Sequence, residues 1–374
     1  PEVRNLCGEL IAAKKAEAAL WNEKFTAFKA SSSAELQSTL AALLQRSVPS
    51  DILARLLKAV PAKETATRNS GGEIMQVAAA AVPALVGGSA DLNPSTKTYL
   101  KGLGDFTPAN RSGRNIHYGI RELGMGLASN GLALSGTAIP FSSTFMVFAD
   151  YMKPALRLAA IQNLHEIFVF THDSIFVGED GPTHQPIEQL AMFRAIPGLT
   201  VIRPAESYET AHAWAAALQA GGPVILCLTR QNVPNLPADV VPRIALHRGA
   251  YVISSDADFE LLLMGSGSEL SCAMGAAELL RQQGHKVRVV SMPSWELFEK
   301  QPAEYRESVL PASCSRRAVV EAGSGFGWER YVGSQGLILG IDHFGASGPY
   351  QVLAREYGFT AEGVCNNVRK FFGL

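Results

Sequence analysis

The chain has 374 residues, of which 47% are hydrophobic and 18% charged. At about 150 residues per domain, this length predicts two or three domains. The 33 Lys+Arg nearly balance the 34 Asp+Glu, and a net charge of −1 argues against a general binder of nucleic acids or anionic membranes, which normally carries a basic excess. The apolar content and the lack of a glycine period exclude a disordered or collagen-like chain.

The cysteines and the chain start bear on the compartment. Five cysteines lie far apart and none forms a C-x-x-C pair, so we expect free thiols in a reducing compartment, with neither a disulfide framework nor a cysteine zinc site. No signal peptide is visible after Pro1, and the longest apolar stretch, 77–86, is too short to span a bilayer. We expect a cytoplasmic protein. Because Pro1 is not Met, we expect it to be processed, tagged and trimmed, or a fragment.

Residues 1–60 are predicted to form a helical lead-in. They are rich in Ala, Leu, Lys and Glu with helical spacing, and they contain no strand-like run. We expect two or three helices there, without a core of their own.

From residue 61 the pattern changes to short apolar runs that alternate with helical stretches. This alternation predicts an α/β domain with a mainly parallel sheet over 61–235. The expected strands are 82–86, 138–141, 167–171, 200–203 and 223–229.

A polar stretch with prolines at 234, 237 and 242 is the expected linker. A second α/β domain follows over 236–374. Its expected strands are 260–265, 286–291 and 317–321, and its expected helices are 268–284 and 349–358.

The densest group of ionisable side chains follows the strand predicted at 167–171. The loop carries His172, Asp173, Glu179, Asp180 and His184, broken by glycines and a proline. Loops at the carboxyl edge of a parallel sheet are where open α/β folds bind ligands, so we expect a binding or catalytic role. A solvated loop that caps the next helix is the alternative, and a metal site is a third possibility, although no H-x-H or H-E-x-x-H pattern is present.

Glu122 is predicted to lie in the first turn of a helix that begins near Ile120. A carboxylate there complements the helix dipole, which is a sufficient structural explanation by itself. If Glu122 instead faces inward among its apolar neighbours, a ligand with a ring nitrogen would suit it.

Three aromatic residues, Phe145, Phe148 and Tyr151, recur every three residues, which predicts that they lie along one side of a helix or helical turn. Such a stripe is more often part of the core. The alternative is a flat platform on which a heteroaromatic ring stacks.

Several segments could bind phosphate. Residues 87–95, ending at Ser95, follow a strand and offer hydroxyls and glycine backbone, while Arg68 and Arg230 lie at the edges of the first α/β segment. Arginine holds phosphate in a bidentate fork, although a single arginine is more often part of an ion pair. The turn at 265–269, Gly-Ser-Gly-Ser-Glu, lacks the spacing of a dinucleotide-binding loop and is weak evidence.

Taken together, these segments resemble transketolase, the thiamine-diphosphate enzyme that moves two-carbon ketol units between sugar phosphates. The resemblance runs from about residue 19 to the end. Two departures are Leu123, where the family usually has Phe, and the pair at 176–177. The motifs that carry the resemblance are GGSADLNPS, IHYGIRELGM, STFMVFADY, THDSIFVGEDGPTHQP, LTRQN, VSMPSWELFEKQPAEYRESVLP and FGASGP.

The resemblance assigns roles to the candidate residues. Glu122 would hydrogen-bond N1′ of the cofactor's aminopyrimidine, and Phe148 would stack on that ring with Phe145 and Tyr151 completing the pocket. His184, with Glu122 one of the two expected catalytic residues, would contact the donor's C1 hydroxyl and carbonyl region, and Asp180 the C2 hydroxyl of an aldose acceptor. The expected sugar-phosphate ligands are Arg68, Ser95, His172 and Arg230.

The family's N-terminal domain, which holds the cofactor's diphosphate through Mg²⁺ or Ca²⁺ with a G-D-G…N signature, is not recognisable. The one Gly-Asp pair, Gly104-Asp105, is followed by Phe-Thr-Pro and has no strand before it. We therefore expect metal and diphosphate ligands on the missing domain, and no metal ligands on this chain.

The expected function is that of part of a transketolase of the pentose phosphate pathway, inactive without that domain. Its expected partners are sugar phosphates of the xylulose 5-phosphate and ribose 5-phosphate class, the missing domain, and a second copy in a homodimer. The alternatives are dihydroxyacetone synthase or another ketol-transfer enzyme, a non-catalytic partner-binding subunit, and a metal hydrolase.

Overall fold

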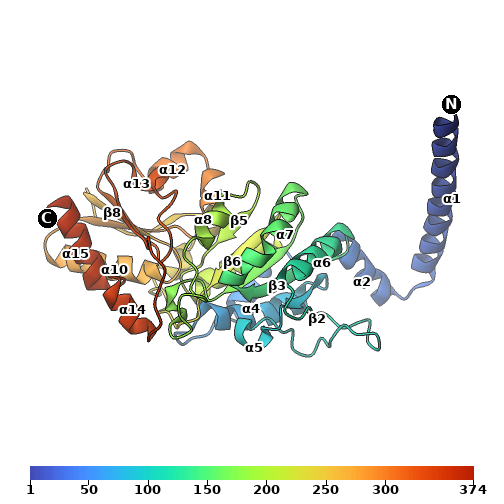
Figure 1. The fold of residues 1–374 in the computed structure, drawn as a ribbon, viewed down its shortest axis with the longest axis horizontal. Helices are drawn as coiled ribbons and strands as arrows, with labels where there is room; N and C mark the ends of the chain where they lie inside the picture. Colours follow the sequence, from blue (N-terminus) through green and yellow to red (C-terminus); the bar gives the residue numbers. More distant parts are fainter.

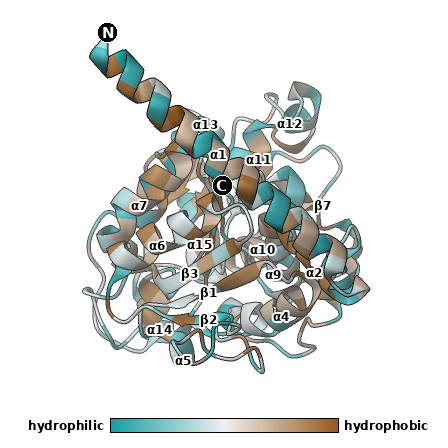
Figure 2. Cartoon of the chain, turned by 90° about the vertical axis from the view of Figure 1, so that its right-hand side faces the viewer, coloured by the Kyte–Doolittle hydropathy of each residue, from teal (hydrophilic) through white to brown (hydrophobic).

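The computed structural model describes residues 1–374 and begins with a helical lead-in, as predicted. No residue of the first helix is buried, and it projects away from the rest of the molecule (Figure 1). Polar and apolar residues are mixed along it (Figure 2). The third helix is the first to bury residues, namely Ile52 and Leu56. The helices of the lead-in are α1 (Glu2–Ser31), α2 (Ala34–Gln45) and α3 (Ile52–Leu57).

The first α/β unit is built on a six-stranded sheet, whose strands all run parallel in the order β2-β1-β3-β4-β6-β5. Its strands are β1 (Leu85–Ser89), β2 (Asn115–His117), β3 (Ile139–Phe145), β4 (Ile167–Thr171), β5 (Thr200–Ile202) and β6 (Val224–Leu228). Its helices are α4 (Thr67–Ala81), α5 (Asn93–Thr96), α6 (Glu122–Leu134), α7 (Ala149–Ile161), α8 (Gln189–Arg194) and α9 (Ser207–Leu218).

The expected strands of this sheet are present, and two of them, β1 and β3, differ by more than one residue in extent. β3 continues to Phe145 instead of ending at residue 141. β1 begins at Leu85 rather than at residue 82 and includes Gly87 and Gly88. At Gly87 a Cβ atom would lie 1.9 Å from the carbonyl oxygen of Phe141 in the neighbouring strand, so a side chain does not fit there. Glycine is therefore needed here so that the two strands can pack closely. Because glycine has a low strand propensity, the sequence pattern did not place it in a strand. β2 was not predicted, because three residues are too few for a period-2 pattern.

The second α/β unit has a five-stranded sheet in the order β11-β10-β8-β9-β7, with β7 antiparallel to β9. β7 and β11 were not predicted. The fold class is therefore two α/β units, one with a parallel sheet and one with a mixed sheet. The strands are β7 (Tyr251–Ser255), β8 (Leu261–Gly265), β9 (Val287–Ser291), β10 (Arg317–Val320) and β11 (Leu337–Leu339). The helices are α10 (Glu269–Gln282), α11 (Trp295–Glu299), α12 (Ala303–Val309), α13 (Glu329–Val332), α14 (Tyr350–Glu356) and α15 (Ala361–Phe372).

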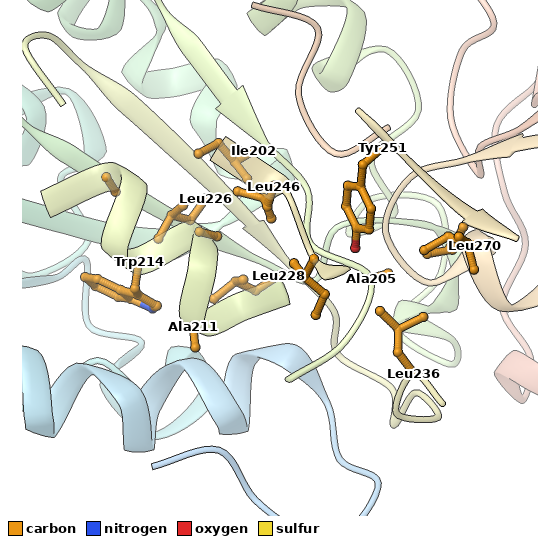
Figure 3. Close-up of a cluster of buried hydrophobic side chains, with 14 of the residues drawn as sticks. Ile202, Ala205, Ala211, Trp214, Leu226, Leu228, Leu236, Leu246, Tyr251 and Leu270 are labelled. Carbon is orange, nitrogen blue, oxygen red and sulfur yellow. The ribbon is translucent and has the colours of Figure 1, made fainter. Parts of the chain in front are cut away.

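One hydrophobic core runs through both units. Figure 3 shows its central part, where Leu228 and Ala205 of the first unit lie near Tyr251 and Leu270 of the second. The Tyr251 hydroxyl also donates a 2.6 Å hydrogen bond to Glu209, a buried carboxylate of α9. The two sheets are therefore packed as one body.

The outer edge of β5 is covered by the second unit. The Val201 amide donates to the Glu296 carboxylate of α11 at 3.0 Å, and the Arg203 amide donates to the Pro293 carbonyl at 2.9 Å. These bonds satisfy backbone donors that a free edge strand would expose.

All five cysteines are free thiols. None of the helices combines the length and the apolar character that crossing a membrane requires.

Candidate active site

Most candidate residues lie at one edge of the first sheet, because they follow the carboxyl ends of its parallel strands. Glu122 follows β2, Ser95 follows β1 and His172 follows β4. Phe145 is the last residue of β3, and Arg230 comes two residues after β6. Parallel strands bring these five positions to the same edge, where open α/β sheets bind ligands.

Arg68 reaches this edge from a helix. The first residue of α4, Thr67, exchanges hydrogen bonds with Thr229 beyond β6: Thr67 N donates to Thr229 Oγ1 at 2.9 Å, and Thr229 N donates to Thr67 Oγ1 at 2.7 Å. This pair seats the start of α4 against the end of β6. As a result the Arg68 guanidinium donates to the Ser95 carbonyl at 3.0 Å and contacts the His172 ring.

His172 is held on both ring nitrogens. Its Nε2 lies 3.2 Å from Arg68 Nη1, and its Nδ1 lies 2.8 Å from Thr171 Oγ1. Because a guanidinium can only donate, Nε2 must be the unprotonated nitrogen, and Nδ1 carries the proton and donates to Thr171. His172 is therefore the neutral Nδ1–H tautomer.

The surroundings of His172 favour that neutral form. Burial, reinforced by the positive charges of Arg68 and Arg230 and by His184, lowers the pKa of His172 to about 3. Burial and the nearby Arg230 also lower the pKa of Arg68. Arg68 Nε is buried without a hydrogen-bond partner. Two arginines beside a neutral histidine, with one buried donor free, form a site suited to an anion.

The aromatic residues form a connected group, although they do not all lie on the single helix or helical turn that was predicted. Phe145 ends β3, Phe148 lies in the following turn and Tyr151 lies in α7. The Phe145 ring stacks on His172 with centroids 3.6 Å apart and on Phe148 at 5.8 Å, and Phe148 stacks on Tyr151 at 6.3 Å. Tyr151 is 66% exposed, so the group is open at one end. The spacing of three residues arises from a strand end followed by a turn, and the sequence pattern does not distinguish this arrangement from a helix.

His184 stands at the edge of this aromatic group. Its ring meets Phe148 edge-on at 5.5 Å and Phe145 at 6.5 Å, and Nδ1 lies 2.9 Å from Thr183 Oγ1. The structure therefore brings His184 and His172 onto the same aromatic pair from the two ends of the loop.

Glu122 is the first residue of α6, two residues later than the predicted start and still in the first turn. Its side chain is 8% exposed and forms no hydrogen bond or ion pair within the chain. Ile120 beside it is 79% exposed, so only part of the expected apolar surround is present. A hollow of about 330 Å³ at the ends of β1 and β2 is lined in part by Ser89, His117 and Gly119. His117 and Gly119 belong to the segment that leads to Glu122.

Two predicted residues are less engaged. We call the group of Arg68, Arg230 and His172 the anion cluster. Ser95 takes part in it through its carbonyl, while its hydroxyl has no hydrogen-bond partner within the chain. Asp180 is exposed on the loop, and its side chain forms no hydrogen bond or ion pair with the other candidates. Neighbouring parts of that loop are held by the second unit, since Ser347 donates to the Glu179 carbonyl at 2.6 Å and Gln185 donates to the Ala346 carbonyl at 2.8 Å.

The turn at 265–269 does not cradle phosphate. Arg203 fills it, because its Nη1 donates to the Ser266 carbonyl at 3.1 Å and to the Glu269 carboxylate. Elsewhere in the chain, no group of three or more His, Cys, Asp and Glu side chains is arranged to hold a metal ion.

The motif reasoning missed Thr171, Thr229 and Arg203. The threonines end or follow buried strands, where a hydroxyl is unremarkable in sequence. Arg203 did carry a signal, since a charged residue directly after the apolar run Thr200–Ile202 is uncommon unless it is paired.

Comparison with known proteins agrees with this arrangement. A family model described as "Transketolase, pyrimidine binding domain" matches residues 63–235, and one described as "Transketolase-like TK C-terminal domain" matches residues 249–360. A transketolase of Geobacillus stearothermophilus is 47% identical over 359 residues, which are 95% of this chain and 54% of that protein. The chain thus spans about half the length of the curated relatives it matches.

Two solved structures are informative. A transketolase of Pichia stipitis in complex with sedoheptulose 7-phosphate is 38% identical, with a TM-score of 0.89 over 97% of this chain and 54% of its own. A chain described as "Split gene transketolase, inactive beta4 tetramer" is 26% identical, with a TM-score of 0.67 over 83% of this chain and 99% of its own. The two matched domains, the fold and the similarity along nearly the whole chain place this protein in the transketolase family.

Proposed function

We propose that this chain is the pyrimidine-binding and C-terminal part of a transketolase, which transfers a two-carbon ketol unit from a ketose phosphate to an aldose phosphate. The observation that carries the proposal is the junction of the anion cluster with the aromatic group: His172 contacts Arg68 and stacks on Phe145. A phosphate site joined to a flat aromatic surface suits a reaction between a sugar phosphate and a heteroaromatic cofactor.

The residues fit the aminopyrimidine part of thiamine diphosphate. The Phe145 and Phe148 rings are nearly parallel at 8°, and the half-buried Phe148 leaves a surface on which a ring can stack. The Glu122 carboxylate is largely buried and lacks a partner within the chain, so a ring nitrogen would satisfy it. When bound, thiamine diphosphate supplies the carbon nucleophile for the two-carbon transfer.

Each residue of the chain then has a defined task. Glu122 would hold a proton at N1′ and so set the tautomer of the pyrimidine. Phe148, with Phe145 and Tyr151, would fix the orientation of that ring. Aligning the reacting groups in this way removes part of the entropic cost of the reaction.

The sugar-phosphate ligands would act at the other side of the aromatic pair. Arg68 and Arg230 would bind the phosphate, with Ser95 and the neutral His172 completing its surround. His184 would contact the C1 hydroxyl and carbonyl region of the donor, and Asp180 the C2 hydroxyl of the acceptor. The named ligand of the Pichia stipitis neighbour, sedoheptulose 7-phosphate, supports this substrate class.

We further propose that the chain is inactive alone and works with a diphosphate-binding domain that supplies the Mg²⁺ or Ca²⁺ ligands. The neighbour described as a split-gene, inactive tetramer supports this proposal, because the match covers almost the entire length of that neighbour's chain. A homodimer is also proposed. An apolar surface on the first unit supports a protein contact there, and its exposed members are Ile120, Leu123, Leu127, Leu134, Leu158 and Ile161.

The proposed domain boundaries are 1–60, 61–235 and 236–374, since the segment between β6 and β7 joins the two sheets. The proposed compartment is the cytoplasm, in keeping with five free thiols.

The experiment is reconstitution with a separately expressed diphosphate-binding domain, thiamine diphosphate and Mg²⁺. We expect transfer from xylulose 5-phosphate to ribose 5-phosphate only in the complete mixture. Turnover by this chain alone would contradict the fragment proposal. Preference for formaldehyde over ribose 5-phosphate would indicate dihydroxyacetone synthase instead. A complete mixture that binds cofactor but transfers nothing would indicate a non-catalytic subunit.

A further inference from the structure

A buried ion cluster joins the two units directly behind His172. Its centre is Arg203, which has 0% exposure and follows β5. Arg203 Nε donates to Asp173 Oδ2 at 2.8 Å, and its Nη1 donates to Glu269 Oε2, at the start of α10. Asp173 belongs to the loop 172–184 that follows β4, which we call the site loop, and Glu269 belongs to the second unit. One guanidinium therefore bridges the site loop and the second unit.

The cluster continues further into the second unit. Arg194 of α8 forms a bidentate pair with Glu321 at 2.6 and 2.8 Å, and Glu321 also accepts from Trp328 Nε1 at 2.8 Å. Ser266 contacts both Arg203 and Glu321, which links the two arginine pairs. The set holds two arginines and three carboxylates, and partners from both units are needed to balance it.

Burial of these five charged groups has a desolvation cost that needs an explanation. Buried ion pairs are weak contributors to stability, because desolvation offsets most of their attraction, and apolar residues would pack the same space. The C-terminal unit could be held by the hydrophobic core alone. A specific geometric task is a better reason to keep five buried charges.

That task is visible in the backbone of the site loop. His172 has φ +62°, a conformation that a residue other than glycine keeps only where its surroundings hold it. On one side Thr171 is fixed as the last residue of β4. On the other side Asp173 is fixed by Arg203. The His172 ring reaches Arg68 and Phe145 only while both flanking residues stay in place.

We propose that Asp173 and Arg203 are positioning residues that hold His172 in the anion cluster, with Glu269 of the second unit anchoring Arg203. This inference rests on the proposed function and deepens it by giving the C-terminal unit a role in sugar-phosphate recognition. Arginine is required, because its planar fork reaches two carboxylates through different nitrogens, whereas a lysine has a single ammonium group.

The first test is NMR of the full chain labelled with ¹⁵N-histidine, in which the His172 signals are assigned by their loss in His172→Gln. At pH 7 the unaltered chain is expected to show one protonated and one unprotonated ring nitrogen for His172. Asp173→Ala leaves Arg203 paired with Glu269, and it is expected to shift these signals. Asp173→Asn keeps an oxygen acceptor for Arg203 Nε and is expected to restore them.

The arginine link is tested by Arg203→Lys, which is expected to shift the His172 signals like Asp173→Ala. If that variant does not fold, Glu269→Ala replaces it, because alanine removes the second-unit acceptor of Arg203 while Arg203 keeps its pair with Asp173. The control is Arg281→Lys, whose pairs with Asp256 and Glu278 lie within the second unit. His172 signals that coincide with those of the unaltered chain in folded Asp173→Ala, or in the arginine-link variant, would overturn the inference.

The second test uses the reconstituted enzyme with ribose 5-phosphate and with ribose. Asp173→Ala is expected to raise KM for ribose 5-phosphate about tenfold, while kcat and the KM for ribose stay within about threefold. Equal losses with both sugars would contradict a role at the phosphate. Because the NMR measurement needs no turnover, inactivity of the unaltered reconstituted enzyme would refute the proposed function and leave the positioning result readable.

Discussion

The two α/β units use the carboxyl edges of their sheets in opposite ways. In the first unit, His172 and Arg230 after strand ends meet Arg68 of α4 without any carboxylate partner, and one buried donor, Arg68 Nε, has no hydrogen-bond partner. In the second unit, the ends of β8 and β10 lead to Ser266 and Glu321, which are enclosed and bound to arginines from the first unit. The same topological edge is thus the proposed ligand site in one unit and an interface in the other.

This difference separates charges that are available for ligands from charges that are already satisfied. Arginine and carboxylate residues occur at both edges, so residue type alone does not distinguish them. Ion pairing does: Arg194 and Arg203 each pair with carboxylates and leave only Arg203 Nη2 buried without a partner, whereas Arg68 and Arg230 form no ion pair and lie near each other and a neutral histidine. Substitutions at the two edges should therefore act on different observables.

The largest effect is expected for Glu122→Ala in the reconstituted enzyme. Loss of the proposed N1′ contact removes an interaction needed to activate the cofactor, and kcat should fall by about three powers of ten. The free energy of unfolding should change little, because Glu122 has no partner in the chain. Glu73→Ala is a matched control, since Glu73 is also a helix carboxylate but is exposed and pairs with Lys101. An equal loss in both variants would contradict the role of Glu122.

The next effect is on stability and belongs to the interface edge. Burial raises the pKa of the Glu321 carboxyl, but Arg194 and Arg203 outweigh burial and lower it to about 2 from 4.5. The ionised form therefore stabilises the fold by about 3 kcal/mol above pH 4.5, and this contribution is lost as the pH falls from 4.5 towards 2.

Glu321→Gln should accordingly lower the free energy of unfolding at pH 7 by about 3 kcal/mol, and the difference from the unaltered chain should shrink between pH 4.5 and 2. Urea unfolding at a series of pH values measures it. Glu299→Gln, which removes a more exposed pair with Arg306, is the control and should cost less than about 1 kcal/mol. A pH-independent difference for Glu321→Gln would show that ionisation is not the cause.

A smaller effect is expected for Arg68→Met at the ligand edge. Loss of one charged hydrogen-bond donor should raise KM for a sugar phosphate about 10- to 30-fold with little change in kcat. Removal of the positive charge should also raise the pKa of His172. Arg157→Met, on α7 and outside the cluster, is the comparison. A loss confined to kcat would indicate that Arg68 acts on the reacting atoms instead of the phosphate.

The smallest effect is expected outside both units. Removal of residues 1–31 should change the free energy of unfolding of the remaining chain by less than about 0.5 kcal/mol, because α1 buries no residue. Urea unfolding of the shortened chain checks this. A larger loss would mean that α1 packs against the units in solution.

The sequence predicted the fold class well because long apolar runs and helical periods are local signals. β4 has the expected bounds, and α6 begins within two residues of expectation. The short edge strands β2, β7 and β11 were missed, since tertiary pairing rather than local pattern makes them strands. Phe145 was assigned to a helix or helical turn and instead ends β3, for the related reason that a strand end and a turn together give the same spacing of three residues.

The candidate site was predictable where a motif or a resemblance named the residue type, as for His172 and Arg68. The partners that hold these residues were not, because Thr171, Thr229 and Arg203 act through contacts with segments distant in sequence. Nor could composition indicate that the turn at 265–269 receives an arginine instead of a phosphate. Its glycines and serines suit either occupant, and only the position of Arg203 decides.

The hydrogen bonds that the backbone amides at β5 donate to Glu296 and Pro293 have a consequence for handling the protein in parts. In the first unit expressed alone, β5 would be an open edge with unpaired amides at Val201 and Arg203, and the apolar surface around Ala205 and Leu228 would lose part of its cover. Such an edge is a template for pairing with another chain. The second unit thus protects the first against self-association, and dissection of this protein into separate domains would yield an aggregation-prone piece even where each sheet is intact.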